Sequence, residues 1–124
     1  MASLILIVDD ELLNRELLET MLGAYGYTTV TASNGLKALE QAQKHQPDLI
    51  LMDIRMPKLD GYETTANLKA DTTVQHIPVV LFSGLKTSPE ERRHATEAGA
   101  VDVLQRGMDM ESLMQYIRKH LPND

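Results

Sequence analysis

The chain has 124 residues, of which 43% are hydrophobic and 24% charged, a length and composition typical of one globular domain over residues 1–124. Its 12 Lys and Arg against 18 Asp and Glu give a net charge of −6, which argues against a nucleic-acid-binding surface. The absence of cysteine excludes disulfides and thiolate metal sites, and without an apolar run long enough for a membrane span or a cleavable leader, we expect a cytoplasmic protein.

Apolar runs alternate with helix-like repeats along the whole sequence. The runs are short and nearly continuous, which is typical of buried parallel strands, and the repeats place apolar residues three and four positions apart. In chain order, we expect a strand over residues 4–8, a helix over 12–25, a strand over 28–32, a helix over 35–45, a strand over 49–52, a helix over 61–70, a strand over 77–82, a helix over 89–98, a strand over 100–104 and a helix over 110–121.

The apolar faces of the helices indicate how each packs on the sheet. The fourth helix has little apolar surface, mainly Ala95 and Ala98, and should be loosely held. The fifth strand is less apolar than the others, which favours an edge position. The expected core-facing residues are Leu13, Leu17, Leu18, Met21 and Leu22 in the first helix, Leu36, Leu39 and Ala42 in the second, and Met110, Leu113, Met114, Ile117 and Leu121 in the last.

Five strands alternating with five helices predict a doubly wound α/β domain, because parallel neighbours are joined by crossover helices that cover both sheet faces. Ligands of such sheets bind outside the carboxyl ends of the strands. Side chains of matching chemistry follow the first, third, fourth and fifth strands. They are Asp9, Asp10, Asp53, Ser83 and Arg106, and we expect them to converge.

This set of side chains suits phosphoryl chemistry. Three neighbouring carboxylates repel one another unless a hard cation neutralises them, and oxygen ligands without His or Cys suit Mg²⁺ or Mn²⁺. The guanidinium of Arg106 and the hydroxyl of Ser83 match the remaining oxygens of a phosphoryl group. A carboxylate such as Asp53 can act as the nucleophile and form an acyl phosphate.

The chain resembles the receiver domain of bacterial two-component response regulators along nearly its whole length. The residues that carry the resemblance are Ile7-Val-Asp9-Asp10-Glu11, Leu51-Met-Asp53-Ile-Arg-Met-Pro57-Lys-Leu-Asp-Gly61, Leu81-Phe-Ser83-Gly84 and Ala98-Gly-Ala100. The resemblance implies a flavodoxin-like sheet with strand order 2-1-3-4-5, an order that such receivers exemplify.

The resemblance also implies how the site works. Asp53 would accept a phosphoryl group from a phosphohistidine on a sensor histidine kinase or phosphotransfer protein, and Ser83 and Arg106 would contact that group. Asp10, Asp53 and the backbone carbonyl of Arg55 would bind Mg²⁺ directly, with Asp9 acting through water. The domain would catalyse only its own phosphorylation and dephosphorylation.

The same resemblance implies a response at the face formed by the fourth helix, fifth strand and fifth helix. Phosphorylation would shift the population of conformations there and change contacts with a downstream protein. This face also serves as a dimer surface in the family, and the sequence leaves a homodimer open. Because no output domain follows the last helix, we expect a stand-alone receiver.

Three departures from the family pattern leave a second hypothesis open. Family members have Lys-Pro with a cis bond after the fifth strand, whereas this chain has Arg106 and Gly107, and a non-proline bond is expected to be trans. Val103 replaces the aromatic residue of the family's switch, and Lys86 is a second candidate for the missing ammonium. The alternative is an interaction module whose output does not depend on phosphorylation.

Two further interpretations are weaker. A phosphohydrolase of the haloacid-dehalogenase type needs a second aspartate two residues after its nucleophile, where this chain has Arg55. The four histidines, His45, His76, His94 and His120, lack the spacing of metal ligands, and we expect them at the surface or in packing contacts.

Overall fold

The computed structural model describes residues 3–84 and 87–121. Its centre is a sheet of five parallel strands in the order β2-β1-β3-β4-β5, as the resemblance implied, and β5 lies at an edge as expected. The strands are β1 (Leu4–Val8), β2 (Thr28–Ala32), β3 (Leu49–Asp53), β4 (Val79–Ser83) and β5 (Asp102–Gln105).

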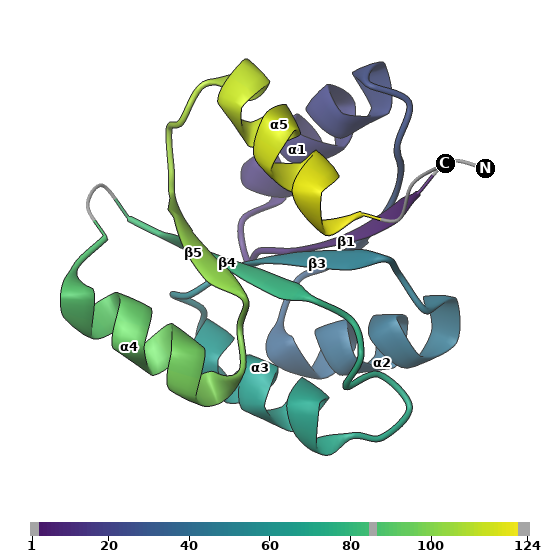
Figure 1. Cartoon of the computed structure of the whole chain (residues 1–124). Helices are drawn as coiled ribbons and strands as arrows, with labels where there is room; N and C mark the ends of the chain where they lie inside the picture. The colour runs from purple at the N-terminus through teal and green to yellow at the C-terminus, as the bar shows by residue number, and fades with distance from the viewer. Residues whose placement is uncertain (1–2, 85–86, 122–124) are drawn as a thin grey trace.

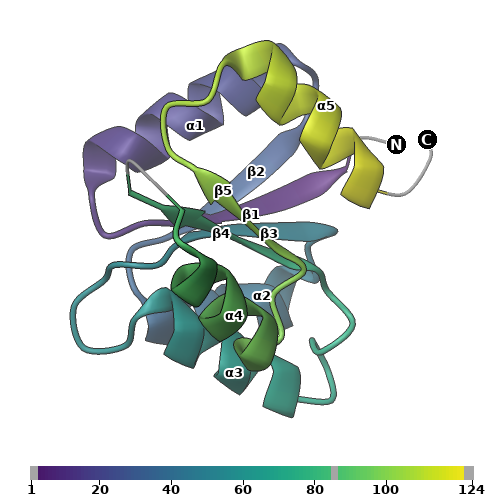
Figure 2. The same cartoon turned by 60° about the vertical axis from the view of Figure 1, so that its left-hand side comes forward.

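Helices cover both faces of the sheet. Figures 1 and 2 show α1 and α5 on one face and α2, α3 and α4 on the other, which confirms the doubly wound arrangement. The helices are α1 (Leu12–Ala24), α2 (Gly35–His45), α3 (Gly61–Ala70), α4 (Pro89–Ala98) and α5 (Met110–His120). Among the described residues, no helix has the length and hydrophobicity needed to cross a bilayer.

The sheet divides the buried side chains into two layers because neighbouring residues of a strand point to opposite faces. In β1, Ile5 and Ile7 pack on the α1–α5 side, whereas Leu6 and Val8 pack on the side of α2, α3 and α4. All four are at most 1% exposed. The near-continuous apolar runs of the sequence therefore follow from burial of the strands on both faces.

Local capping fixes where the helices that follow β3, β4 and β5 begin. Asp60 and Ser88 each form a capping box, with Glu63 and Glu91 respectively, and Asp109 caps α5. Ala95 is the only buried residue of α4, in agreement with the little apolar surface expected of it. This helix therefore has few core contacts to resist a shift.

Three leucines that we expected in the core are exposed. Leu13 is 74% exposed, Leu17 56% and Leu36 65%. In α1 the sheet is covered by Leu18 and Leu22 instead, because spacings of three and four describe a stripe wider than the face that the helix can bury. The strands β4 and β5 also begin two residues later than predicted, at Val79 and Asp102.

Candidate functional site

Three carboxylates meet at the carboxyl edge of the sheet. Asp9 and Asp10 follow β1, and Asp53 ends β3, whose Met52 is in register with Val8. One oxygen from each carboxylate lies within 4.8 Å of the others. Since adjacent parallel strands end at the same edge, the fold itself creates this acidic cluster.

Asp9 is the buried member of the cluster and is held on several sides. Its carboxylate accepts a hydrogen bond from the backbone N–H of Glu11 at 2.9 Å, and the guanidinium of Arg15 donates to its backbone carbonyl at 2.7 Å. The side chain is only 1% exposed. These contacts fix the direction in which Asp9 faces the site, whereas Asp10 is exposed to solvent.

Arg106 reaches the acidic cluster from the far side. Its Nη2 donates to Oδ2 of Asp9 and lies 3.5 Å from Oδ1 of Asp53, while its guanidinium carbon is 5.5 Å from the ring centre of Phe82. There are no cis peptide bonds in the described part of the chain, as expected for the bond to Gly107. Gly107 has φ +85°, a conformation that glycine adopts without strain and that this turn requires.

The environment of Asp53 raises the pKa of its carboxyl group. Burial is the largest cause and the charge of Asp9 adds to it, whereas the charge of Arg106 and hydrogen bonds from Arg106 and the Arg55 backbone N–H lower the pKa. The net direction shows that the protein disfavours a bare carboxylate at this position. A further positive charge at the site would offset that cost.

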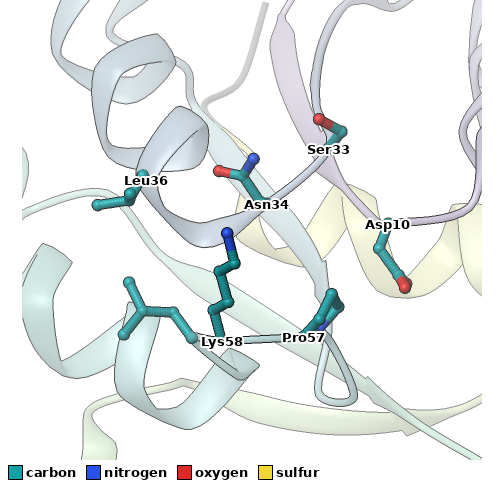
Figure 3. Close-up of a pocket in the computed structure, with 7 residues that line it drawn as sticks. Asp10, Ser33, Asn34, Leu36, Pro57 and Lys58 are labelled. Atoms are coloured by element: carbon teal, nitrogen blue, oxygen red, sulfur yellow. The ribbon is translucent and has the colours of Figure 1, made fainter.

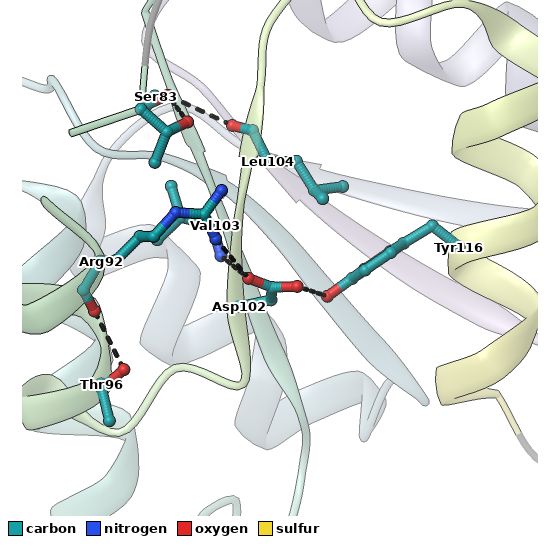
Figure 4. Close-up of polar contacts among 8 residues, drawn as sticks. Ser83, Arg92, Thr96, Asp102, Val103, Leu104 and Tyr116 are labelled. Atoms are coloured by element: carbon teal, nitrogen blue, oxygen red, sulfur yellow. Dashed lines mark hydrogen bonds and ion pairs between the residues drawn. The ribbon is translucent and has the colours of Figure 1, made fainter. Parts of the chain in front are cut away.

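Ser83 ends β4 beside Asp53, but its hydroxyl is engaged elsewhere. The oxygen lies 2.8 Å from the hydroxyl oxygen of Thr87 and 3.4 Å from the carbonyl oxygen of Leu104 (Figure 4). The side chain is 1% exposed. A contact between Ser83 and a group on Asp53 would therefore require the hydroxyl to leave these partners.

A cavity of about 510 Å³ opens beside Asp10. Figure 3 shows Ser33, Asn34 and Lys58 on its walls, from the loops after β2 and β3. Lys58 has φ +69°. The cavity provides a way for a solvated ion or an anionic group to approach the exposed end of the acidic cluster.

A second polar cluster, which the sequence reasoning missed, ties β5 to its neighbouring helices. Asp102 accepts hydrogen bonds from the hydroxyl of Tyr116 and the backbone N–H of Val103, both at 2.7 Å, and Arg92 of α4 lies 3.7 Å away (Figure 4). Burial and the bond to Asp102 raise the pKa of Tyr116. No sequence motif indicates this cluster, because it depends on three separate elements.

The cluster surrounds the position where the family has its switch aromatic. Val103 is 3% exposed and packs in the core below α4, so no ring is available there to rotate between the core and solvent. Lys86, the other candidate ammonium, lies outside the described residues. Among the residues that the structure describes, Arg106 brings a positive charge to the acidic cluster.

The donor chemistry fits a hard divalent cation. Three carboxylates with no nitrogen or sulfur ligand offer the oxygen atoms that Mg²⁺ prefers, and the exposed edge at Asp10 leaves room for the waters that it retains. Asp9, Asp10, Asp53 and Arg106 come together as predicted. The ligand role of the Arg55 carbonyl stays a prediction, and His76 and His94 are exposed at the surface.

Comparison with known proteins agrees with this geometry. The sequence model of the response regulator receiver domain matches residues 5–118. The polar-differentiation response regulator DivK of Brucella anthropi is 35% identical over 117 residues, which cover 94% of each chain. DivK of Brucella ovis is 34% identical over 121 residues, 98% of each chain.

Solved structures show the same fold. The chemotaxis protein CheY4 of Vibrio cholerae superimposes with a TM-score of 0.91 and 28% identity, over 98% of this chain and 100% of that one. The receiver domain of the sensor histidine kinase PA1611 of Pseudomonas aeruginosa, with a magnesium ion coordinated in its active site cleft, gives a TM-score of 0.86 and 28% identity, over 97% and 98% of the two chains. Receiver domains are signalling modules and not enzymes in the usual sense. The chain belongs to the response regulator receiver domain family.

Proposed function

We propose that residues 1–124 form one phosphoryl-accepting receiver in which Asp53 is the acceptor. The observation that carries this proposal is the grouping of Asp53 with the carboxylates of Asp9 and Asp10, 3.5 Å from the guanidinium of Arg106. Its pKa is raised mainly by burial, and because an acyl phosphate carries more negative charge than the carboxylate, the guanidinium of Arg106 and a bound cation would neutralise the added charge. The departures from the family pattern at Val103 and Gly107 leave all of these site groups in place.

The acidic cluster would hold Mg²⁺, and Mn²⁺ suits the same oxygen ligands. Asp10 and Asp53 would bind it directly together with the Arg55 carbonyl, and Asp9 would act through water. When bound, the cation neutralises charge on the carboxylates and on the transferred phosphoryl oxygens. This function requires no rearrangement of the sheet, because the three carboxylates already face one point.

The bonds that form and break in the transfer step belong to Asp53 and the donor's phosphohistidine. A carboxylate oxygen of Asp53 forms a bond to phosphorus while the bond from phosphorus to the donor's histidine nitrogen breaks, and the nitrogen keeps that electron pair. Arg106 lies where it can neutralise the phosphoryl oxygens, and Ser83 would turn from Thr87 to donate a hydrogen bond to one of them. In this way the domain catalyses its own phosphorylation and, with water as the attacking group, its dephosphorylation.

The partners follow from the two sides of the site. A sensor histidine kinase or phosphotransfer protein in the cytoplasm would approach the carboxyl edge of the sheet, where α1 begins shortly after Asp10 and exposes Leu12, Leu13 and Leu17. A downstream protein, or a second copy of the chain, would contact α4, β5 and α5, where Asp102 and Tyr116 connect the elements. The alternative of a module independent of phosphorylation is not favoured, because Arg106 is placed in the site and not in bulk solvent.

The test is capture of a phosphoryl group by Asp53. Acetyl phosphate with Mg²⁺ should add one phosphoryl mass to the wild-type chain and none to Asp53→Ala, and beryllofluoride should shift backbone amide signals near Asp53, Ser83 and Arg106. Glu40→Gln, which removes an exposed carboxylate of α2 outside the acidic cluster, is the matched control and should label normally. Absence of any adduct on the wild type, with hydrolysis during handling controlled, would overturn the proposal.

A further inference from the structure

Both carboxylate oxygens of Asp9 already accept a hydrogen bond in this structure. One oxygen accepts the backbone N–H of Glu11 at 2.9 Å, and the other accepts a charge-assisted hydrogen bond from Nη2 of Arg106. The Asp9 side chain is 1% exposed and that of Arg106 is 30% exposed. A buried carboxylate is thus paired with a cation whose outer part still faces solvent.

We propose that Arg106 is a built-in competitor of the divalent cation for Asp9, so that cation binding displaces its guanidinium toward Asp53. This inference rests on the proposed function, because the cation site is the one that serves Asp53. Arginine can exchange one carboxylate for the other because its guanidinium has several donors in a fixed fork. A single nitrogen, Nη2, already lies within ion-pair distance of both Asp9 and Asp53.

The competition follows from charge and geometry. The three carboxylates lie within 4.8 Å of one another, so a divalent cation at their centre would lie close to the Arg106 guanidinium, and like charges at such a distance repel. The buried Asp9 stays in place, since the backbone N–H of Glu11 holds its side chain and Arg15 holds its backbone carbonyl. Arg106 is the member of the pair that is free to move, because its side chain is partly exposed.

A displaced guanidinium has a second position already available. Asp53 Oδ1 is 3.5 Å from Nη2, and the ring of Phe82 lies 5.5 Å from the guanidinium carbon and supports it from one side. Cation binding would therefore release Arg106 from Asp9 and leave it beside the oxygen that receives the phosphoryl group. Metal occupancy and placement of the positive charge would be coupled steps.

Magnesium titration tests this coupling without phosphorylation. Isothermal titration calorimetry with Mg²⁺ alone should show that Arg106→Gln binds the cation on the order of tenfold more tightly than the wild type. This factor corresponds to the free energy of about one charge-assisted hydrogen bond. The matched control is Arg15→Gln, which removes the same charge next to Asp9 but bonds only its backbone carbonyl. The Mg²⁺ affinity of Arg15→Gln should differ from that of the wild type by less than about threefold.

A double-mutant cycle with Asp9→Asn separates competition from simple charge repulsion. If Arg106 acts through Asp9, the gain from Arg106→Gln should shrink to less than about threefold in the Asp9→Asn background. The wild type gives an independent measurement that needs no variant to fold. The Nε–H signal of Arg106 should move during the Mg²⁺ titration with the same midpoint as the amide signal of Glu11.

The outcomes distinguish the two proposals. Magnesium binding to the wild type with equal affinity in Arg106→Gln, or an Arg106 signal that does not move, would overturn the competition and leave the phosphoryl acceptor intact. An equal gain from Arg106→Gln with and without Asp9 would overturn it as well. No magnesium binding to any variant would overturn both the competition and the proposed cation site.

Discussion

The hydroxyl oxygens of Ser83 and Thr87 lie 2.8 Å apart, and their hydrogen bond connects the end of β4 to the residue just before the cap of α4. Ser88, the next residue, begins α4 with a capping box. Phosphoryl capture at Asp53 would draw Ser83 away and leave Thr87 without this bond. The link offers a route from the site to α4 that needs no aromatic ring at Val103.

Removing the Thr87 hydroxyl should favour the phosphoryl-bound state. Thr87→Val keeps the shape of the side chain and frees the Ser83 hydroxyl from its partner, at a cost of about 1 kcal/mol to the unbound state. Beryllofluoride, measured by amide shifts in the presence of Mg²⁺, should bind about fivefold more tightly. Thr87→Ser keeps the hydroxyl and should bind like the wild type, and equal affinity in all three proteins would exclude the link.

Gly61 positions the loop that carries the acceptor. A Cβ at this residue would lie 2.6 Å from the carbonyl oxygen of Asp53 and 2.8 Å from Cα of Ile54, and these backbone atoms cannot turn aside as a side chain could. Gly61→Ala should therefore lower the free energy of unfolding by about 1–3 kcal/mol and slow labelling of Asp53 by acetyl phosphate.

The matched control lies in α1. A Cβ at Gly23 would meet no atom within 4 Å, so Gly23→Ala should raise the free energy of unfolding by about 0.5–1 kcal/mol, the difference in helix propensity between the two residues. Urea unfolding monitored by circular dichroism measures both variants. If Gly61→Ala proved as stable as the wild type, the close approach of the start of α3 to the end of β3 would be in error.

Asp53 should make stability fall as pH rises. Its pKa is raised in the folded state from an ordinary value of 3.8, first through burial, so the folded state binds the proton more tightly than the unfolded state. The penalty is absent below the unfolded pKa and fully present above the folded one. Asp53→Asn should thus be more stable than the wild type at pH 7, by a margin that shrinks toward about pH 4.

Urea unfolding at several pH values tests this sign. Adding Mg²⁺ at pH 7 should narrow the margin between wild type and Asp53→Asn, because a bound cation favours the carboxylate form and stabilises the folded state that binds it. A margin that grew as the pH fell would contradict the raised pKa. Glu40→Gln, at an exposed position of α2, controls for the loss of one negative charge.

The sequence predicted the fold and the acidic cluster well because both depend on local patterns. The continuous apolar runs could belong only to strands buried on both faces, and parallel topology then placed Asp9, Asp10 and Asp53 at one edge. Which leucines α1 buries could not be predicted, since the rotation of a helix on its sheet is decided by tertiary packing. Leu13 and Leu17 were misplaced for this reason.

Side-chain contacts between separate elements could not be predicted either. Nothing in the sequence showed that Thr87 engages Ser83 or that Tyr116 bonds Asp102, because each pair depends on side-chain directions across separate elements. The position of Arg106 was open as well, since its loop lacks the family's proline. The structure resolved it by bringing the guanidinium to Asp9.

The Asp102 cluster should stabilise the α4–β5–α5 face through α5 more than through α4. Tyr116→Phe removes a half-buried 2.7 Å hydrogen bond to a carboxylate and should lower the free energy of unfolding by about 1.5 kcal/mol. Arg92→Gln removes an exposed ion pair at 3.7 Å and should change it by less than about 0.5 kcal/mol. Equal losses in urea unfolding would contradict this ranking.

The exposed leucines of α1 should matter for the protein donor and not for a small one. Leu13 is 74% exposed and Leu17 56% exposed, and exposed apolar side chains on one helix favour contact with another protein. Leu13→Ser should lower the kcat/KM of phosphotransfer from the cognate histidine donor by about tenfold, the effect of losing one buried leucine at an interface. Labelling by acetyl phosphate should stay unchanged, because Leu13 is not a member of the acidic cluster. Leu36→Ser on α2 makes the same change at another exposed leucine and tests whether the contact extends across the cavity beside Asp10. If Leu13→Ser slowed transfer from the histidine donor and from acetyl phosphate equally, the variant would have a structural defect, and Leu13 would not be part of a docking surface.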